Sequence, residues 1–229
     1  PTDVLEATRI SALSRRFFDG DEVQQYEVGL KTTLFDGRVS LQTAAYFLDW
    51  KDMIMVEEDP LVGATNPLNY YNTNSGGAEI SGFEITVTAF LTERLSITVG
   101  GDVNDGEVTQ GPVFGTNSPK TNELIYAPPW SATLVMDYDI PLSNGWMMSL
   151  HADHAWVDVQ WTDTRNTLTI DAYQKTNARI TLRDPNEKWR VGLFATNLTN
   201  EEIVRNRSGA STLYWYQPRQ IGLEVGYTM

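Results

Sequence analysis

The amino-acid sequence predicts an all-β fold, namely an antiparallel segment of a transmembrane β-barrel with about nine or ten strands. Three observations lead to this fold class. Apolar and polar residues alternate with a period of two, short turns alternate with long polar loops, and aromatic residues gather near the ends of the expected strands. Each feature is typical of an outer-membrane barrel, whose strands cross lipid with an apolar outer face and a polar inner face.

The alternation is clearest in the last ten residues. Ile221, Leu223, Val225, Tyr227 and Met229 share one face, and the residues between them are polar or glycine. Side chains at every second position of a strand lie on the same side of the sheet. Extended to the other strands, the pattern predicts which side chains face lipid and which face the lumen. Lipid-facing examples are Leu134, Leu150, Leu193 and Leu223, and lumen-facing examples are Thr98, Asp137, Arg179 and Glu224.

The alternating stretches predict nine strands, and a further strand is expected near residues 8–18. The nine cover 23–35, 38–56, 78–91, 94–109, 130–140, 145–161, 171–183, 188–205 and 214–229.

The expected connections come in two sizes that alternate along the chain. The short turns lie at 36–37, 92–93, 142–144 and 184–187. The longer polar loops lie at 57–77, 110–129, 162–170 and 206–213. Short turns on one rim and long loops on the other are a property of outer-membrane barrels, and a soluble β-sandwich has no reason to sort its loops in this way.

Aromatic residues mark the ends of the expected strands. Amphipathic rings prefer the headgroup zone of a membrane, so these residues are expected to form two girdles around the barrel. They are Trp50, Tyr70, Tyr71, Tyr126, Trp130, Trp146, Trp156, Trp161, Trp189, Tyr214, Trp215 and Tyr216.

Composition excludes several functional classes. The chain of 229 residues has 30 acidic and 17 basic side chains, a net charge of −13, so a nucleic-acid partner is not expected. There is no cysteine, which excludes disulfides, thiolate zinc sites and cysteine nucleophiles. No nucleophile elbow or phosphate-binding glycine loop occurs, so we expect no enzymatic activity, no cofactor and no metal site.

Four segments carry a resemblance to a known family. They are YEVGLKTTLFDGRVSLQTAAYFLDWKDM at 26–53, GGAEISGFEITVTAF at 76–90, WRVGLFATNLTNEEIV at 189–204 and YWYQPRQIGLEVGYTM at 214–229. In this order and spacing they resemble the C-terminal part of the barrel of TonB-dependent outer-membrane receptors. One departure is that such barrels usually end on an aromatic residue, whereas this chain ends at Met229.

The resemblance implies a larger assembly than these residues supply. Receptors of this family have a barrel of about 22 strands closed by an N-terminal plug. Nine or ten strands are less than half of that number, and neither the plug nor the TonB box is recognisable in residues 1–229. We therefore expect residues 1–229 to be the C-terminal portion of a receptor barrel, as a segment of a larger chain or as one chain of a split receptor. Its partners would be outer-membrane lipid, the N-terminal half of the barrel and the plug.

The function that the resemblance implies is active import across the outer membrane of a Gram-negative bacterium. The receptor would bind a scarce nutrient such as siderophore-bound iron, cobalamin or a carbohydrate, and the TonB–ExbB–ExbD complex would supply the energy. The small-molecule ligand is expected at the long loops, because aromatic side chains offer stacking surfaces and Arg pairs with carboxylates. The candidates are Tyr70, Tyr71, Asn72, Trp161, Arg165, Arg205, Arg207, Tyr214 and Trp215. The simpler alternative is that these residues serve the aromatic girdle and the loop structure.

A second set of candidates lies on the expected lumen side. A charge inside a plugged barrel needs a partner, so these side chains are expected to pair with the plug or with one another. They are Glu84, Arg179, Arg183 and Glu224. Two other functions stay open from the sequence: a passive porin-type barrel, and a soluble β-sandwich that binds a ligand.

Overall fold

The computed structural model describes residues 17–58, 70–111, 120–209 and 211–228. The strand expected near residues 8–18 lies outside these ranges except for residues 17 and 18, which are not in a strand. Within the described ranges, no helix is long and apolar enough to cross a membrane.

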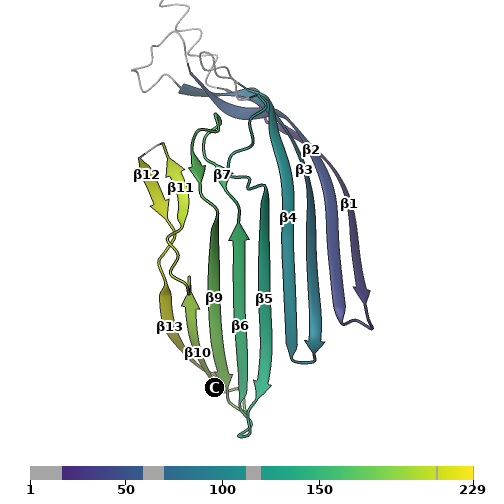
Figure 1. Ribbon diagram of the computed structural model, residues 1–229, viewed down its shortest axis with the longest axis vertical. Helices are drawn as coiled ribbons and strands as arrows, with labels where there is room; N and C mark the ends of the chain where they lie inside the picture. The colour runs from purple at the N-terminus through teal and green to yellow at the C-terminus, as the bar shows by residue number, and fades with distance from the viewer. Residues whose placement is uncertain (1–16, 59–69, 112–119, 210, 229) are drawn as a thin grey trace, which may run out of the picture.

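One antiparallel sheet of nine strands dominates the structure (Figure 1). Its order is β1-β2-β3-β4-β5-β6-β9-β10-β13, so strands that follow one another along the sheet are also neighbours in sequence apart from two small hairpins. β1 and β13 form its two edges, and the sheet is not closed. The strands are β1 Glu22–Leu34, β2 Val39–Glu58, β3 Tyr70–Thr92, β4 Leu95–Gln110, β5 Trp130–Pro141, β6 Met147–Val157, β9 Tyr173–Arg183, β10 Trp189–Thr196 and β13 Gln220–Tyr227. The predicted all-β, antiparallel fold is confirmed.

The connections sort by length between the two ends of the sheet. Short turns join β1 to β2, β3 to β4, β5 to β6 and β9 to β10 at the lower end in Figure 1. The longer connections lie at the upper end, where two hairpins form: β7 Gln160–Trp161 with β8 Thr169–Ile170, and β11 Val204–Ser208 with β12 Thr212–Trp215. We call these ends the short-turn rim and the long-loop rim.

Three predicted strands were too long. The strand expected at 145–161 ends at Val157, and Trp161 belongs to the separate hairpin β7–β8. The strand expected at 188–205 ends at Thr196, because Asn197 adopts a left-handed backbone with a φ of 49°. The buried Asn197 side chain holds this corner: its amide donates to the Glu201 carbonyl at 2.9 Å, and its Oδ1 accepts from the Glu201 N–H at 2.9 Å.

The strand expected at 214–229 is also divided. Residues 214–215 pair with β11, and the strand that joins the large sheet begins only at Gln220. Pro218 lies in the interval, where its lack of an N–H suits an unpaired segment.

The predicted loop at 57–77 is wrong at both of its ends, which are strand, and its middle part at 59–69 lies outside the described residues. β2 continues to Glu58, and β3 begins at Tyr70 and pairs with it. A bulge lies between Trp50 and Met53, where Asp52 has a φ of 53°. The predicted strand 38–56 already includes this bulge. The predicted start of the next strand at residue 78 coincides with another register shift, between Gly77 and Ala78 where β3 pairs with β4. A bulge interrupts the period-two pattern by which a strand is read from sequence.

The cross-strand register gives the sheet one apolar face and one polar face. Leu150, Ile180, Leu193 and Leu223 form a row of paired residues, and Leu134 lies on the same face through its pairing with His154. On the opposite face Asp137, His151 and Arg179 form a parallel row, and Glu224 and Thr98 lie on the same face outside that row. The predicted assignment of these side chains to two faces is therefore confirmed.

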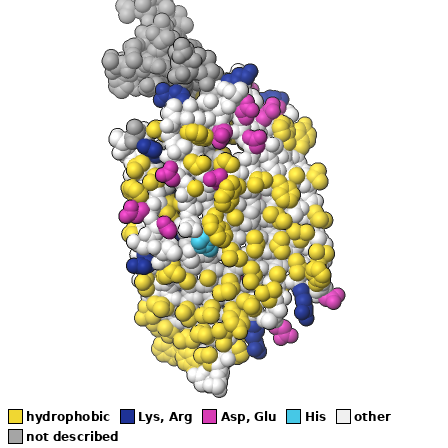
Figure 2. Space-filling view, viewed as in Figure 1, with side chains coloured by type: hydrophobic (Ala, Val, Ile, Leu, Met, Phe, Trp, Pro, Cys, Tyr) yellow, Lys and Arg dark blue, Asp and Glu magenta, His cyan; other side chains and the backbone are white. Residues whose placement is uncertain are grey.

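The apolar face is not covered by other described residues. Val28 is 79% exposed and Leu223 is 69% exposed. Figure 2 shows a broad expanse of hydrophobic side chains over the lower and middle part of one face, with acidic side chains near the long-loop rim. A soluble β-sandwich buries such a face against a second sheet, so this exposure is a strong argument against a soluble sandwich.

Aromatic rings on the apolar face lie toward both ends of the strands. Trp130 and Trp156 are near the long-loop rim, and Trp189 packs on Tyr227 near the short-turn rim with 4.7 Å between ring centroids. Trp50, which was expected in the girdle, does not lie on the apolar face. It pairs with Val23 and Ala78 on the polar face, and its indole N–H donates to Asp21 at 2.8 Å.

Substitutions at two neighbouring residues of β4 test the assignment of the apolar and the polar face. Replacing Val99, which is 50% exposed on the apolar face, by Arg should destabilise the full-length protein in lipid by roughly 2–4 kcal/mol, because a charge is placed against hydrocarbon. Thr98→Arg should cost much less, because Thr98 lies on the polar face. The measurement is the midpoint of guanidinium unfolding in phospholipid vesicles, and equal destabilisation by the two variants would contradict the assignment.

Candidate ligand-binding rim and lumen wall

The segment 120–129 extends the sheet above β5 and is fixed to β4 by backbone hydrogen bonds. The Val108 N–H donates to the Asn122 carbonyl at 2.8 Å, and the Leu124 N–H donates to the Gly106 carbonyl at 3.0 Å. At the end of the segment, the Asn104 N–H donates to the Pro129 carbonyl at 2.9 Å. This part of the predicted loop 110–129 is therefore held in place by the sheet.

The two hairpins of the long-loop rim are joined to this segment by side-chain hydrogen bonds. Trp161 donates its indole N–H to Glu123 at 3.1 Å, and Asn166 exchanges two hydrogen bonds with the Glu123 backbone, at 2.8 and 3.1 Å. Tyr126 donates to the Asn206 side chain at 2.7 Å, and Arg207 donates to the Thr169 carbonyl at 3.2 Å. Residues 120–129, 158–170, 204–209 and 211–215 thus form one connected structure, which we call the outer ledge.

Asp163 organises the tip of the hairpin β7–β8. Its carboxylate accepts hydrogen bonds from the Thr167 and Leu168 N–H groups at 2.9 and 2.8 Å and from the Thr167 hydroxyl at 2.8 Å. Partial burial alone would raise the pKa of Asp163, but these hydrogen bonds favour the charged form and hold its pKa below the ordinary value of 3.8. The hairpin is therefore stabilised by the ionised form of Asp163.

An apolar pocket lies beside the ledge, beneath the bulged end of β2. Its volume is about 520 Å³, and it lies between β2, β4 and the segment 120–129. Met53 and Met55 are buried in its wall and pack with Ala78, Trp50 and Leu124. Gly76 permits this packing, because a Cβ there would come within 2.7 Å of the Met55 side chain. None of these residues was among the predicted ligand contacts, because the pocket exists only through the bulge and the docking of segment 120–129.

The predicted ligand contacts fall into two groups. Tyr70, Tyr71 and Asn72 lie in β3, opposite the end of β2, and not in a loop. The other six belong to the ledge: Trp161, Arg165, Arg205, Arg207, Tyr214 and Trp215. Trp161 and Arg207 are engaged in the hydrogen bonds that join the ledge, whereas Trp215 is 53% exposed and Tyr214 is 48% exposed. The exposed rings are thus the ones available for stacking.

On the polar face, two of the predicted lumen charges pair with each other. Arg179 donates two hydrogen bonds to Glu224, at 2.9 and 3.0 Å, and Arg190 also donates to Glu224. Arg179 lies over the ring of Phe194, 5.2 Å from its centroid. Arg190 was missed as a candidate, although the alternation in its strand already places it on the polar face. No ion pair involves Arg183 among the described residues.

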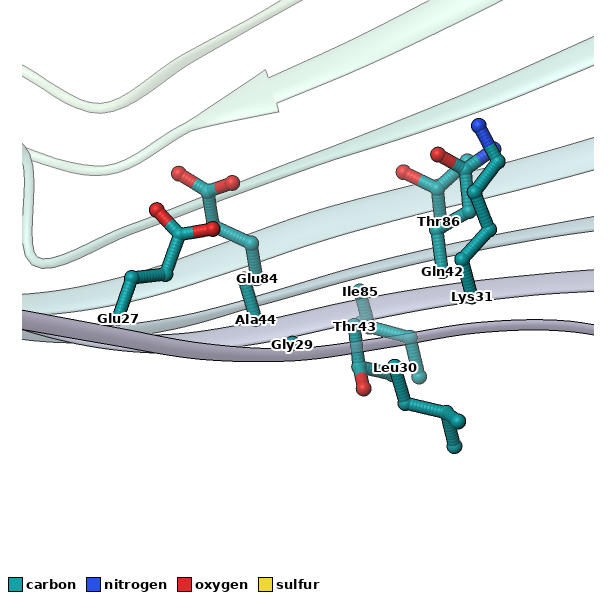
Figure 3. A pocket seen from close by; sticks show the side chains of 10 residues that line it. All are labelled: Glu27, Gly29, Leu30, Lys31, Gln42, Thr43, Ala44, Glu84, Ile85 and Thr86. Atoms are coloured by element: carbon teal, nitrogen blue, oxygen red, sulfur yellow. The ribbon is translucent and has the colours of Figure 1, made fainter.

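The polar face is hollowed where small residues meet. A depression of about 340 Å³ lies over Gly29 and Ala44, which are paired in β1 and β2. Figure 3 shows Glu27 and Glu84 pointing to the same side of the sheet as Lys31, while Leu30 and Ile85 point to the other. No hydrogen-bond partner for the Glu84 carboxylate occurs in the described part of the chain. Glu84 therefore faces the open side of the polar face, as the sequence predicted.

Comparison with known proteins identifies this architecture. Residues 16–198 match the family described as "TonB dependent receptor-like, beta-barrel". The chain belongs to the TonB-dependent receptor family. Receptors of this family are located in the outer membrane of Gram-negative bacteria, bind small-molecule ligands such as siderophores and interact with TonB. Both the family and the fold are those of transport receptors, not of enzymes.

The relatives are longer than this chain. It is 29% identical over 153 residues to the metal-pseudopaline receptor CntO of Pseudomonas aeruginosa, covering 67% of this chain and 19% of CntO. It is 24% identical over 213 residues to the ferrioxamine receptor of Yersinia enterocolitica, covering 89% of this chain and 27% of the receptor. The structure is similar to that of the ferric yersiniabactin uptake receptor FyuA of Yersinia pestis, with a TM-score of 0.74, 17% identity and coverage of 90% and 30%. The chain thus spans about a fifth to a third of these proteins.

Asp163 offers a test of the ledge. Asp163→Ala in the full-length receptor should speed hydrogen exchange of the Thr167 and Leu168 amides at neutral pH by about tenfold, because both amides lose a charged acceptor. In the wild type the protection should persist as the pH falls to 3.8 and disappear below it, as the carboxylate is protonated through its lowered pKa.

Arg165→Ala is the matched control. Arg165 is exposed and lies 3.8 Å from Asp163, and an exposed pair of this kind contributes little. If Asp163→Ala and Arg165→Ala changed the exchange of these amides equally, Asp163 would not be the organising residue of the hairpin.

Proposed function

We propose that this chain forms the C-terminal strands of an outer-membrane receptor that imports a metal chelate with energy transmitted by TonB. The chain would complete its barrel with further strands along β1 and β13 and would enclose a plug against its polar face. The ligand would bind above the membrane, at the outer ledge and the exposed rings of Tyr214 and Trp215.

The observation that carries this proposal is the two-faced sheet of nine strands with all its long connections on one rim. A strand in lipid must satisfy its backbone polar groups within a sheet, and edge strands need partners. Both edges of this sheet have long rows of pairing groups, in the 13 residues of β1 and the 8 residues of β13. Further strands would pair with these backbone groups on both edges, as happens in a closed barrel.

The charges on the polar face support a barrel interior that is filled by a plug and not by water alone. Arg179, Arg190 and Glu224 form a compact ionic cluster on β9, β10 and β13, while Glu27 and Glu84 project from the same polar face in β1 and β3, in the other half of the sheet. Charges that a plug would cover need ionic or hydrogen-bonding partners, and Glu84 has a free carboxylate to offer a basic group of the plug. A barrel of about 22 strands is wide enough to leak unless a plug fills it.

The class of ligand is supported by the relatives. CntO is a receptor for metal-pseudopaline, and the Yersinia enterocolitica relative is a receptor for ferrioxamine. Both ligands are metal complexes of organic chelators. We therefore favour a metal chelate over cobalamin or a carbohydrate for this receptor.

Deleting TonB tests the proposal. Cells that express the full-length receptor should accumulate a ⁵⁵Fe-labelled chelate only when TonB and the proton gradient are present, because displacing a plug requires external work. Binding of the same chelate to the cell surface should persist without TonB, because it needs only the ledge. The measurement is ⁵⁵Fe retained by washed cells at 37 °C, compared with ⁵⁵Fe bound at 0 °C.

A panel of ferric chelates, including ferrioxamine, supplies the probes, and cells that lack the receptor are the control. Accumulation that survives both TonB deletion and an uncoupler would establish passive diffusion. The porin-type function would then replace the one proposed.

A further inference from the structure

We infer that the apolar pocket beneath the bulge of β2 binds a neutral aromatic ring of the imported ligand. This inference rests on the proposed function and specifies one chemical group of the substrate. The pocket lies between the strand end that contains Met53 and Met55 and the segment 120–129, so it opens on the same rim as the ledge.

The size and lining of the pocket suit a small molecule. Its volume of about 520 Å³ lies within the range of small-molecule sites, which are concave and mostly apolar with a few polar groups. Its wall includes the thioethers of Met53 and Met55 and the indole of Trp50. Aliphatic side chains complete the apolar lining, namely those of Ile54, Val56, Val108, Leu124, Ile125 and Ala127. Glu123 and Thr164 supply polar groups.

The kind of side chain favours an aromatic group over an alkyl group. Methionine sulfur makes favourable contacts with the edges of aromatic rings, and an indole offers a face for offset stacking. Two thioethers and one indole lie together here, and Met55 is only 7% exposed. An alkyl group would fill the same space but would gain neither of these contacts.

Charge sets a second condition on the ring. The Glu123 carboxylate is at the pocket and accepts a hydrogen bond from Trp161. A carboxylate on the ligand would be repelled there, whereas a neutral ring with a hydrogen-bond donor would not be. The ring that fits therefore carries no negative charge, and a neutral ring also avoids the cost of desolvating a cation against the apolar wall.

The wall of the pocket is held in place by packing and by backbone hydrogen bonds. Gly76 leaves room for both methionine side chains, and hydrogen bonds from Leu124 and Val108 hold the segment 120–129 against β4. A preformed pocket loses little conformational freedom on binding, so even a small fragment should occupy it.

The test uses the full-length receptor in phospholipid nanodiscs, with ¹³C-methyl methionine and the neutral probe benzamide. Benzamide should shift the methyl signals of Met53 and Met55 saturably. The signals of Met147 and Met148, at the short-turn rim, should stay in place. Cyclohexanecarboxamide is the matched aliphatic probe and should bind about two- to tenfold more weakly, the loss expected for a sulfur–aromatic contact.

Variants at Ala127, which lines the pocket, provide the second arm. Ala127→Trp should fill the space and abolish the shifts, whereas Ala127→Ser should retain them. If the tryptophan variant does not fold, Leu124→Asn takes its place. This variant makes the wall of the pocket polar and should weaken benzamide binding. Unchanged Met147 and Met148 signals verify folding in each case.

Three results would overturn the inference: no saturable shift with benzamide, equal affinity for the two probes, or shifts that persist in Ala127→Trp. The binding assay needs neither TonB nor a proton gradient. A negative result would therefore remove the aromatic pocket and leave the import proposal standing. Accumulation without TonB, together with intact benzamide shifts, would remove the import proposal and leave the aromatic pocket standing.

Discussion

The structure depends on one constraint: in lipid, every backbone N–H and C=O must find its partner within the protein. An antiparallel ladder across the nine described strands meets most of this demand, with register shifts in the β2–β3 and β3–β4 pairs and with unpaired edges at β1 and β13. Side chains are then free to differ between the two faces, because they take no part in the ladder. Leu223 therefore lies exposed on the apolar face while the adjacent Glu224 joins an ionic cluster with Arg179 and Arg190 on the polar face.

At the long-loop rim the backbone meets water, and the constraint is relaxed. The chain there contains a bulge beside Asp52, a left-handed corner at Asn197 and short hairpins joined by side chains. Bulges are frequent at the rims of barrels. The result is a ledge whose parts come from distant segments, together with a preformed pocket. If exposed rings such as Trp215 bind the ligand as proposed, their rigid placement favours binding, since less flexibility is lost when the ligand is held.

The sequence predicted the part of the structure that local periodicity encodes. A period of two is enough to assign Thr98 and Leu223 to opposite faces, and the short turns mark one rim. It did not predict features that depend on residues far apart in the chain. The Trp161–Glu123 hydrogen bond spans 38 residues, and the pocket at Met53 requires both a bulge and the docking of Leu124. Strand 188–205 was drawn too long because the turn at Asn197 rests on hydrogen bonds from its own side chain, which alternation does not reveal.

The central claim is that one face of this sheet lies in lipid and the other in the interior of a receptor. The most direct measurement places single cysteines, one at a time, at each residue from Leu95 to Val103 of β4, in a cysteine-free full-length receptor in lipid. Each cysteine is spin-labelled, and its collision rates with oxygen and with a water-soluble nickel complex are measured. We expect high oxygen accessibility at Leu95, Ile97, Val99, Gly101 and Val103 and low accessibility at the four residues between them. Accessibility without a period of two, or with the two sets exchanged, would contradict the claim.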